Sequence, residues 1–172
     1  FFLGGSGDHR DLQSFPTRRS SDLGSFGPQQ VVAQITWAGF RSVFAKDLDG
    51  DGDLDVLAAD YENDEVLWFE NLAPATPGNF GPKQVITTSA DGAASVFATD
   101  LDGDGDADVL SASYQDDKIA WHENLGLASG TFGGARVLTS AANGAYDVYA
   151  ADLNDDGFVD VLSAAESSGI AW

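Results

Sequence analysis

The 172-residue chain contains no cysteine and no apolar run long enough to cross a membrane. The first absence excludes disulfide bonds, and it removes cysteine usage as a guide to the cellular compartment. The second predicts no membrane insertion, because a transmembrane helix needs about 20 apolar residues.

Basic residues are scarce: eight Lys and Arg stand against 28 Asp and Glu, which leaves a net charge of −20. Nucleic acids and anionic lipids are both bound through clustered Lys and Arg. We therefore expect neither as a partner. With 43% apolar residues, the chain can still bury a substantial core.

The acidic residues are concentrated in three loops that recur along the chain. The segments Asp47-Leu-Asp-Gly-Asp-Gly-Asp-Leu-Asp55, Asp100-Leu-Asp-Gly-Asp-Gly-Asp-Ala-Asp108 and Asp152-Leu-Asn-Asp-Asp-Gly-Phe-Val-Asp160 hold half of all the acidic residues. They start 53 and then 52 residues apart. This period is typical of a four-stranded propeller blade and too long for a helical pair in a solenoid.

Four short runs rich in Val, Ile, Phe and Trp surround each loop in a fixed order. In the first unit they are Val31-Val32, Ser42-Val-Phe-Ala, Val56-Leu-Ala-Ala and Val66-Leu-Trp-Phe. Gly, Asn and Asp bound the runs, which indicates strands joined by tight turns. We predict an all-β fold, a β-propeller fragment of about three four-stranded antiparallel blades, each with a calcium-binding hairpin loop.

The repeats occupy residues 24–172 and divide as 24–77, 78–129 and 130–172. Residues 1–23 share no landmark with them and resemble the translation of a DNA-sequencing adapter, so we interpret them as a non-native or disordered leader. There is no Met, and the third unit stops at Trp172 where the others continue. We expect a partial chain whose propeller is closed by the remaining blades of its parent chain or by other chains.

Alternating carboxylates in a tight loop direct oxygen ligands toward one centre, which is the chemistry that Ca²⁺ prefers. An EF-hand is excluded because its twelfth position needs a Glu, and Ala58, Ser111 and Ser163 stand there. Mg²⁺ resists dehydration, and zinc or iron would require recurring His or Cys. We predict about three Ca²⁺ ions, one per loop. The predicted ligands are Asp47, Asp49, Asp51, Asp53 and Asp55; Asp100, Asp102, Asp104, Asp106 and Asp108; and Asp152, Asn154, Asp156, Phe158 through its carbonyl, and Asp160.

The Phe-Gly landmarks at Phe26, Phe80 and Phe132, the acidic loops and the Trp-x-Glu-Asn endings together resemble FG-GAP repeats, also called VCBS repeats. These are the blades of integrin-α-like β-propellers. The resemblance implies calcium at the hairpin between a blade's first two strands, with blades near 42–88, 95–139 and 146–172. It also implies an extracellular setting, secreted or at the cell surface, with roles in adhesion or carbohydrate binding. Asn154, Phe158 and Gly134 depart from the pattern in the third unit.

No acid, base or nucleophile recurs beside the loops, so we expect a non-catalytic protein. His122 takes the place of Phe69 and is assigned to packing or to a blade rim, while Trp68, Trp121 and Trp172 are expected to fill the wedges between blades. The predicted function is a calcium-binding module for protein or carbohydrate ligands. The alternatives are an accessory propeller of a secreted polysaccharide-degrading enzyme and a structural spacer.

Overall fold

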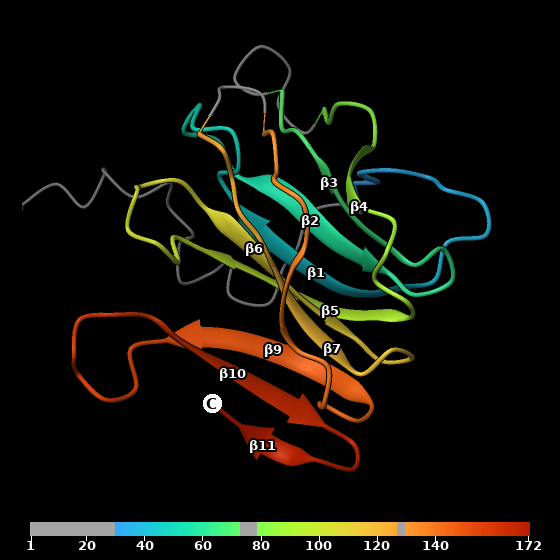
Figure 1. Cartoon of the computed structure of the whole chain (residues 1–172). Coiled ribbons are helices and arrows are strands. Elements are labelled where there is room, and N and C mark those ends of the chain that lie inside the picture. The colour runs from blue at the N-terminus through green and yellow to red at the C-terminus, as the bar shows by residue number, and fades with distance from the viewer. Residues whose placement is uncertain (1–29, 73–78, 127–129) are drawn as a thin grey trace, which may run out of the picture. The chain divides into compact units, whose positions relative to one another are not determined.

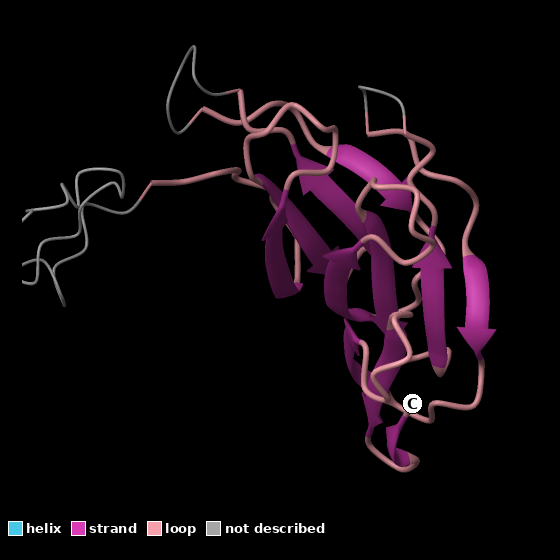
Figure 2. Cartoon of the chain, turned by 90° about the vertical axis from the view of Figure 1, so that its left-hand side faces the viewer, coloured by secondary structure: helices cyan, strands magenta, loops and turns pink. Residues whose placement is uncertain are grey.

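The computed structural model describes residues 30–72, 79–126 and 130–172 (Figure 1). The chain divides into two units, Phe1–Val31 and Val32–Trp172. The expected leader at 1–23 lies outside the described residues, as do the expected repeat junctions near 77–78 and at 129. Within the described ranges the chain forms strands, turns and loops with no helix, so none of these residues forms a helix able to cross a membrane (Figure 2).

Three antiparallel sheets follow one another along the chain. The first sheet contains β1 (Phe40–Lys46), β2 (Asp55–Asp60), β3 (Glu65–Phe69) and β4 (Gln84–Thr87). The second contains β5 (Ala93–Thr99), β6 (Asp108–Ser113), β7 (Lys118–His122) and β8 (Arg136–Thr139). The third contains β9 (Ala145–Ala151), β10 (Asp160–Ala165) and β11 (Gly169–Ala171).

The fold prediction is confirmed, because the described residues are all-β and their three antiparallel sheets match the expected blades closely. The fourth strand of the first sheet, β4, and that of the second sheet, β8, each follow the Phe-Gly landmark of the next sequence unit. The third sheet has three strands among the described residues, in the order β11-β10-β9.

The second and third strands of each sheet are neighbours because the turn between them is short and polar. In the β2–β3 turn, Asp64 has a φ of 59°, and in the β6–β7 turn Asp117 has a φ of 60°. Asp is one of the few residues that tolerate this left-handed conformation. Each carboxylate also accepts a hydrogen bond from the residue just before the following sheet, at 2.8 Å from Gly92 N and from Gly144 N respectively. The turns therefore connect neighbouring sheets as well as neighbouring strands.

The core lies between the sheets, where each sheet is covered by the next. Leu57, Val66 and Trp68 of the first sheet pack against Val96 and Ala98 of the second. The second and third sheets repeat this arrangement, with Leu110 and Ile119 against Val148 and Ala150. Alanines on the receiving side allow close approach of the sheets, and the first strands β1, β5 and β9 become neighbours (Figure 1).

Candidate metal centre

Each acidic loop joins the first two strands of its sheet and is folded around its first carboxylate. Asp47 accepts hydrogen bonds from Gly50 N at 2.8 Å and from Gly52 N at 3.0 Å. Asp100 does the same with Gly103 N at 2.7 Å and Gly105 N at 3.0 Å. The glycines have φ angles between 79° and 100°, which a side chain would disfavour. The loop backbone thus fixes the first carboxylate before any cation binds.

The last carboxylate of each of the first two loops is buried at the start of the second strand, whereas Asp160 in the third loop is half-buried. Asp55 has no exposed surface, and its two oxygens accept hydrogen bonds from Leu48 N and Asn71 N, both at 2.8 Å. Asp108 is equally buried and accepts from Leu101 N at 3.1 Å and Asn124 N at 2.7 Å. A carboxylate held by two backbone donors keeps one orientation, which suits it to act as a fixed ligand.

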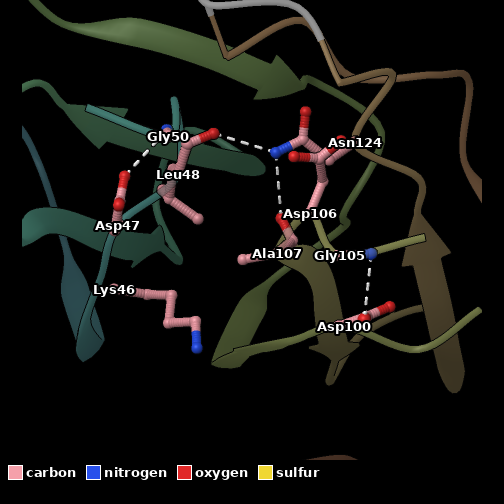
Figure 3. A pocket seen from close by; sticks show the side chains of 9 residues that line it. All are labelled: Lys46, Asp47, Leu48, Gly50, Asp100, Gly105, Asp106, Ala107 and Asn124. Atoms are coloured by element: carbon pink, nitrogen blue, oxygen red, sulfur yellow. Dashed lines mark hydrogen bonds between the residues drawn. The ribbon is translucent and has the colours of Figure 1, made fainter. Parts of the chain in front are cut away.

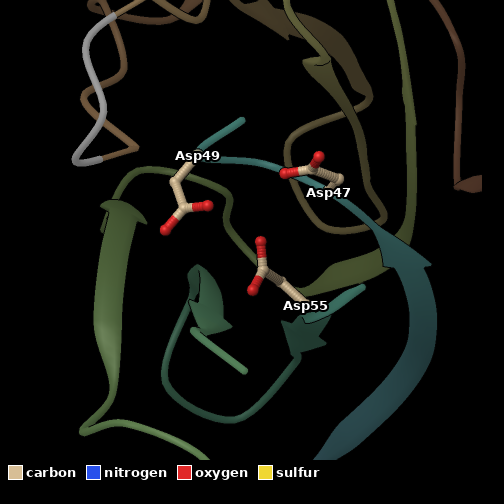
Figure 4. Close-up of side chains that lie close together, drawn as sticks. All are labelled: Asp47, Asp49 and Asp55. Carbon is tan, nitrogen blue, oxygen red and sulfur yellow. The ribbon is translucent and has the colours of Figure 1, made fainter. Parts of the chain in front are cut away.

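Three carboxylates converge in each of the first two loops. One oxygen from each of Asp47, Asp49 and Asp55 lies within 4.8 Å of the other two, and Figure 4 shows the three groups turned toward one another. Asp100, Asp102 and Asp108 form the equivalent group. We call these the first and second trios. They bring together positions one, three and nine of the predicted ligand set.

The remaining predicted ligands of these loops lie outside the trios. Asp51 and Asp104 use a carboxylate oxygen to accept the N–H of Asp53 and Asp106, at 2.8 and 2.9 Å. These bonds shape the turn itself. The predicted backbone-carbonyl ligands at Asp53 and Asp106 remain predictions.

The electrostatics of the trios favour a bound cation. Burial raises the pKa of Asp55 to about 6, against the hydrogen bonds from Asn71 and Leu48 that lower it, and repulsion from Asp49 and Asp51 adds to the rise. The pKa of Asp108 is raised by the same causes. Within the described ranges, neither trio forms an ion pair with a lysine or arginine. Among the described residues, no ion pair with a basic side chain therefore offsets the charge of either trio.

The third loop has the same turn but a weaker ligand set. Asp152 accepts from Gly157 N at 2.9 Å, and Asp160 accepts from Leu153 N at 3.1 Å. Asn154 replaces the carboxylate at position three, and no trio of carboxylates is found here among the described residues. The side chain of Phe158 is 75% exposed. The five predicted ligands of this loop remain a prediction.

One residue that the sequence reasoning did not assign to the site connects the first two loops. The buried side-chain amide of Asn124 donates to the carbonyl of Leu48 in the first loop at 2.8 Å and to that of Ala107 in the second at 3.1 Å (Figure 3). Its backbone N–H holds Asp108. The recurrence of Asn71 and Asn124 at the end of the third strand was the available signal, since Asn71 also donates to a loop carbonyl, that of Leu54, at 3.0 Å.

Asn124 lies at the edge of a cavity of about 190 Å³ between the two loops. Asp47, Asp100 and Asp106 contribute to its lining, together with Lys46 (Figure 3). The cavity thus borders one carboxylate of each trio, Asp47 and Asp100.

The remaining residues named from the sequence, His122, Glu123 and the tryptophans, make packing, hydrogen-bond or ion-pair contacts away from the trios. His122 is 1% exposed, and its Nε2 lies 3.1 Å from the hydroxyl of Ser111. Trp68 is buried between the first two sheets, as expected of a wedge residue, whereas Trp172 is 71% exposed. Glu123 forms an ion pair with Arg136, whose guanidinium also lies 4.6 Å from the ring centroid of Trp121.

The donors present in the trios fit a hard cation. All are carboxylate oxygens, which is the ligand class of Ca²⁺ and Mg²⁺, and neither sulfur nor imidazole is among them. The set thus agrees with the calcium prediction in ligand type.

One family of known proteins matches this chain over more than half of its length. The model of the FG-GAP-like repeat matches twice, at residues 47–111 and at residues 100–163. Each match begins at the first Asp of an acidic loop and runs through the next loop. No curated protein sequence matches the chain significantly. The matched repeats, the sheet order and the loop geometry agree, and the chain belongs to the FG-GAP-like repeat family.

Proposed function

We propose that this β-propeller-type module binds calcium in its acidic loops and is held together by it. The observation that carries this proposal is the pair of matched trios, each containing a fully buried carboxylate that forms no ion pair with a basic side chain in the part of the chain that the structure describes. Asp47, Asp49 and Asp55 would hold one ion, and Asp100, Asp102 and Asp108 the second. A third ion in the loop of Asp152 and Asp160 is expected to bind more weakly, because Asn154 supplies no charge.

A bound divalent cation would supply the positive charge that the trios lack. Asp55 and Asp47 come from opposite ends of the loop, so a ligand shared by both closes the hairpin between β1 and β2. Binding that needs the folded loop adds its free energy to folding. The role that we propose for calcium is therefore structural, in a protein without catalytic activity.

The ligand surface of the module is proposed to lie at the other end of the sheets. Tyr61, Tyr114 and Tyr146 gather there with Arg41 around a cavity of about 90 Å³. The ring centroid of Tyr114 lies 6.4 Å from that of Tyr61 and 5.9 Å from that of Tyr146. The guanidinium of Arg41 lies 4.4 Å from the centroid of the Tyr61 ring. Aromatic rings beside a charged group can stack on a sugar or anchor a protein loop, so a glycan or protein ligand fits this surface.

An extracellular location, secreted or at the cell surface, completes the proposal. Extracellular calcium modules bind with dissociation constants of about 10⁻⁴ to 10⁻³ M, which matches the free calcium outside cells. Small trios with few charged ligands are suited to this range.

Calorimetric titration of the full chain with calcium tests the proposal. We expect two similar sites with a third that is weaker, and loss of one site in each of Asp49→Asn and Asp102→Asn. Asp53→Asn is the matched control, because it removes the same charge from the loop but leaves the trio intact. No heat of binding in a folded sample, or equal loss in Asp53→Asn and Asp49→Asn, contradicts the proposal.

A further inference from the structure

We propose that the cavity beside Arg41 binds a carboxylated sugar, a uronic acid residue of a glycan. The guanidinium of Arg41 pairs with the carboxylate, and the rings of Tyr61, Tyr114 and Tyr146 pack against the sugar. This assignment rests on the ligand surface proposed above and names the chemical class of its ligand. It does not depend on calcium in the acidic loops.

The cavity is built from equivalent positions of three consecutive sheets. Arg41, Ala94 and Tyr146 are the second residues of the first strands β1, β5 and β9, which are neighbours. Tyr61 and Tyr114 directly follow the second strands β2 and β6. These five residues line a space of about 90 Å³. Ala94 has the smallest of the five side chains and belongs to the middle sheet, so the cavity has a described sheet on each side.

The rings of Tyr61 and Tyr114 are positioned by the glycine that precedes the next sheet. A Cβ atom at Gly92 would lie 3.1 Å from the ring of Tyr61, and one at Gly144 would lie 3.2 Å from that of Tyr114. Both glycines also have positive φ angles, 64° and 68°, which a side chain would disfavour. Each ring therefore packs on the backbone of the next sheet, and the aromatic wall of the cavity is in place before a ligand arrives.

Arg41 is a cation without an acidic partner in a strongly acidic chain. Lys83, Lys118 and Arg136 each form an ion pair with a carboxylate, whereas within the described ranges Arg41 forms none. Its guanidinium lies on the face of the Tyr61 ring, which leaves the N–H groups at its edge for a ligand. A carboxylate matches the planar guanidinium through two parallel hydrogen bonds. The side chain is thus suited to recognise an acid group.

The size of the cavity favours part of a sugar over an apolar anchor from a protein. A cavity of about 90 Å³ is smaller than the roughly 300 Å³ or more that encloses a whole small molecule. It can admit a carboxylate and the adjoining edge of a sugar ring, and the ring of Tyr146, 60% exposed, offers a face for the remainder. An aromatic anchor of a protein partner needs a pocket that removes it fully from water.

The charges around the cavity orient the ligand. Arg41 belongs to the first sheet, whereas Glu166 directly follows β10 of the third sheet and accepts a hydrogen bond from the hydroxyl of Tyr114. A second carboxylate beside Glu166 would be repelled, so we expect the acid group of the sugar at Arg41. The uncharged hydroxyl groups of the sugar then lie toward Tyr146, where Glu166 can accept a hydrogen bond from one of them.

The net charge of −20 opposes an acidic ligand mainly at long range. Half of the acidic residues lie in the three acidic loops, and Asp47 stands six positions after Arg41 along the extended strand β1, about 20 Å away. At physiological ionic strength the screening length is about 8 Å. The contact with Arg41 should therefore outweigh repulsion from the loops.

Calorimetric titration of the full chain with tetragalacturonate, in millimolar calcium, tests the proposal. The methyl ester of the same sugar is the matched probe, because it keeps the rings and removes the charge. We expect the acid to bind about 10- to 100-fold more tightly than the ester, which is the effect of one charged hydrogen-bonded pair. Equal affinities overturn the proposal. Tighter binding of an oligoglutamate peptide also overturns it, since the partner would then be an acidic protein.

Two variants locate the binding. Arg41→Gln removes the partner of the carboxylate and Ala94→Leu fills the cavity, so each should weaken binding of the acid by about 10-fold or more. Lys83→Gln is the control and should bind like the unchanged chain, because it removes the same charge outside the cavity. Arg41 is exposed, so Arg41→Gln should melt at the temperature of the unchanged chain. Unchanged affinity in this variant overturns the proposal.

A calcium titration of the same samples separates the sugar site from the calcium sites. A chain that binds calcium but not tetragalacturonate overturns the uronic acid site and leaves the acidic loops as calcium sites. A chain that binds tetragalacturonate through Arg41 without binding calcium supports the sugar site and contradicts the calcium proposal.

Discussion

Asp55 accepts two backbone hydrogen bonds, yet burial still raises its pKa to about 6. In the metal-free protein a raised carboxyl pKa means that protonation stabilises the fold. That contribution is complete below the unfolded value of 3.8 and is lost as pH rises through about 6. Calcium needs the ionised carboxylate, so its stabilising effect has the opposite pH dependence.

We predict that calcium raises the free energy of unfolding much more at about pH 7.5 than at about pH 5. Urea denaturation with calcium and with a chelator, at both pH values, measures the difference. Comparing the two samples at one pH cancels the titration of groups remote from the loops, such as His122. An equal calcium effect at both pH values contradicts the assignment of Asp55 as a ligand.

The contribution of His122 to stability depends on pH in the opposite direction from that of Asp55 in the metal-free protein. Burial lowers its pKa to about 4, so the folded state holds it neutral while the unfolded chain takes up a proton below about pH 6.5. Its contribution is therefore complete above pH 6.5 and is lost as pH falls toward 4, on the order of 2 kcal/mol between pH 7 and pH 5.

The first sheet contains the control for this effect, because Ala58 and Phe69 occupy the positions of Ser111 and His122. The double variant Ser111→Ala with His122→Phe should lose that pH dependence in metal-free denaturation experiments. His122→Phe alone should be less stable than the double variant, because it leaves the buried Ser111 hydroxyl without its partner. Unchanged pH dependence in the double variant would show that another group titrates.

At the scale of elements, the third acidic loop differs from the others in its backbone. Asp155 has a φ of 60° where the other loops have Gly50 and Gly103, at 79° and 83°. Asp155→Gly should therefore stabilise the protein by about 0.5–1 kcal/mol, and the reciprocal Gly103→Asp should destabilise it by a similar amount. Thermal unfolding of both variants without calcium gives the comparison. A loss of stability in Asp155→Gly would contradict the assigned conformation.

The asparagine that follows the third strand of each of the first two sheets also stabilises the acidic loops. Asn124 bridges two loops from a buried position, whereas the Nδ2 bond of Asn71 to Leu54 is exposed. Asn124→Ala should cost about 2–3 kcal/mol, because it leaves buried carbonyls without donors, and Asn71→Ala should cost about 1 kcal/mol. Chemical denaturation measures both. Equal costs would indicate that the bridge between the loops contributes little.

The strands, the three sheets and the acidic loop between the first two strands of each sheet could be predicted from sequence, because hydrophobic runs and loop motifs repeat at a fixed interval. The sequence could not predict which carboxylates of a loop converge and which do not. Asp47, Asp51 and Asp55 are identical in type and all accept backbone N–H groups, but only the folded turn decides that Asp47 and Asp55 also join the trio while Asp51 does not. The bridge from Asn124 to Leu48 depends on the stacking of two sheets, which local sequence does not specify.

At the scale of the whole molecule, the stability of each sheet depends on its packing against the neighbouring sheet. Each sheet buries one face on its neighbour, and each acidic loop closes one hairpin. The two trios are connected through Asn124, so occupying one should support the other. Losing the ions should therefore weaken the whole stack and not one hairpin alone.

Thermal unfolding of the full chain in a chelator, in magnesium and in calcium tests this account most directly. A cation that binds only the folded loops raises the melting temperature, and the rise grows with the logarithm of the ratio of cation concentration to dissociation constant. The account predicts one cooperative transition that shifts upward by roughly 10 °C or more in millimolar calcium, and far less in equimolar magnesium. Identical melting temperatures in calcium and chelator, from a sample with a cooperative transition, would contradict calcium as the clamp of this fold.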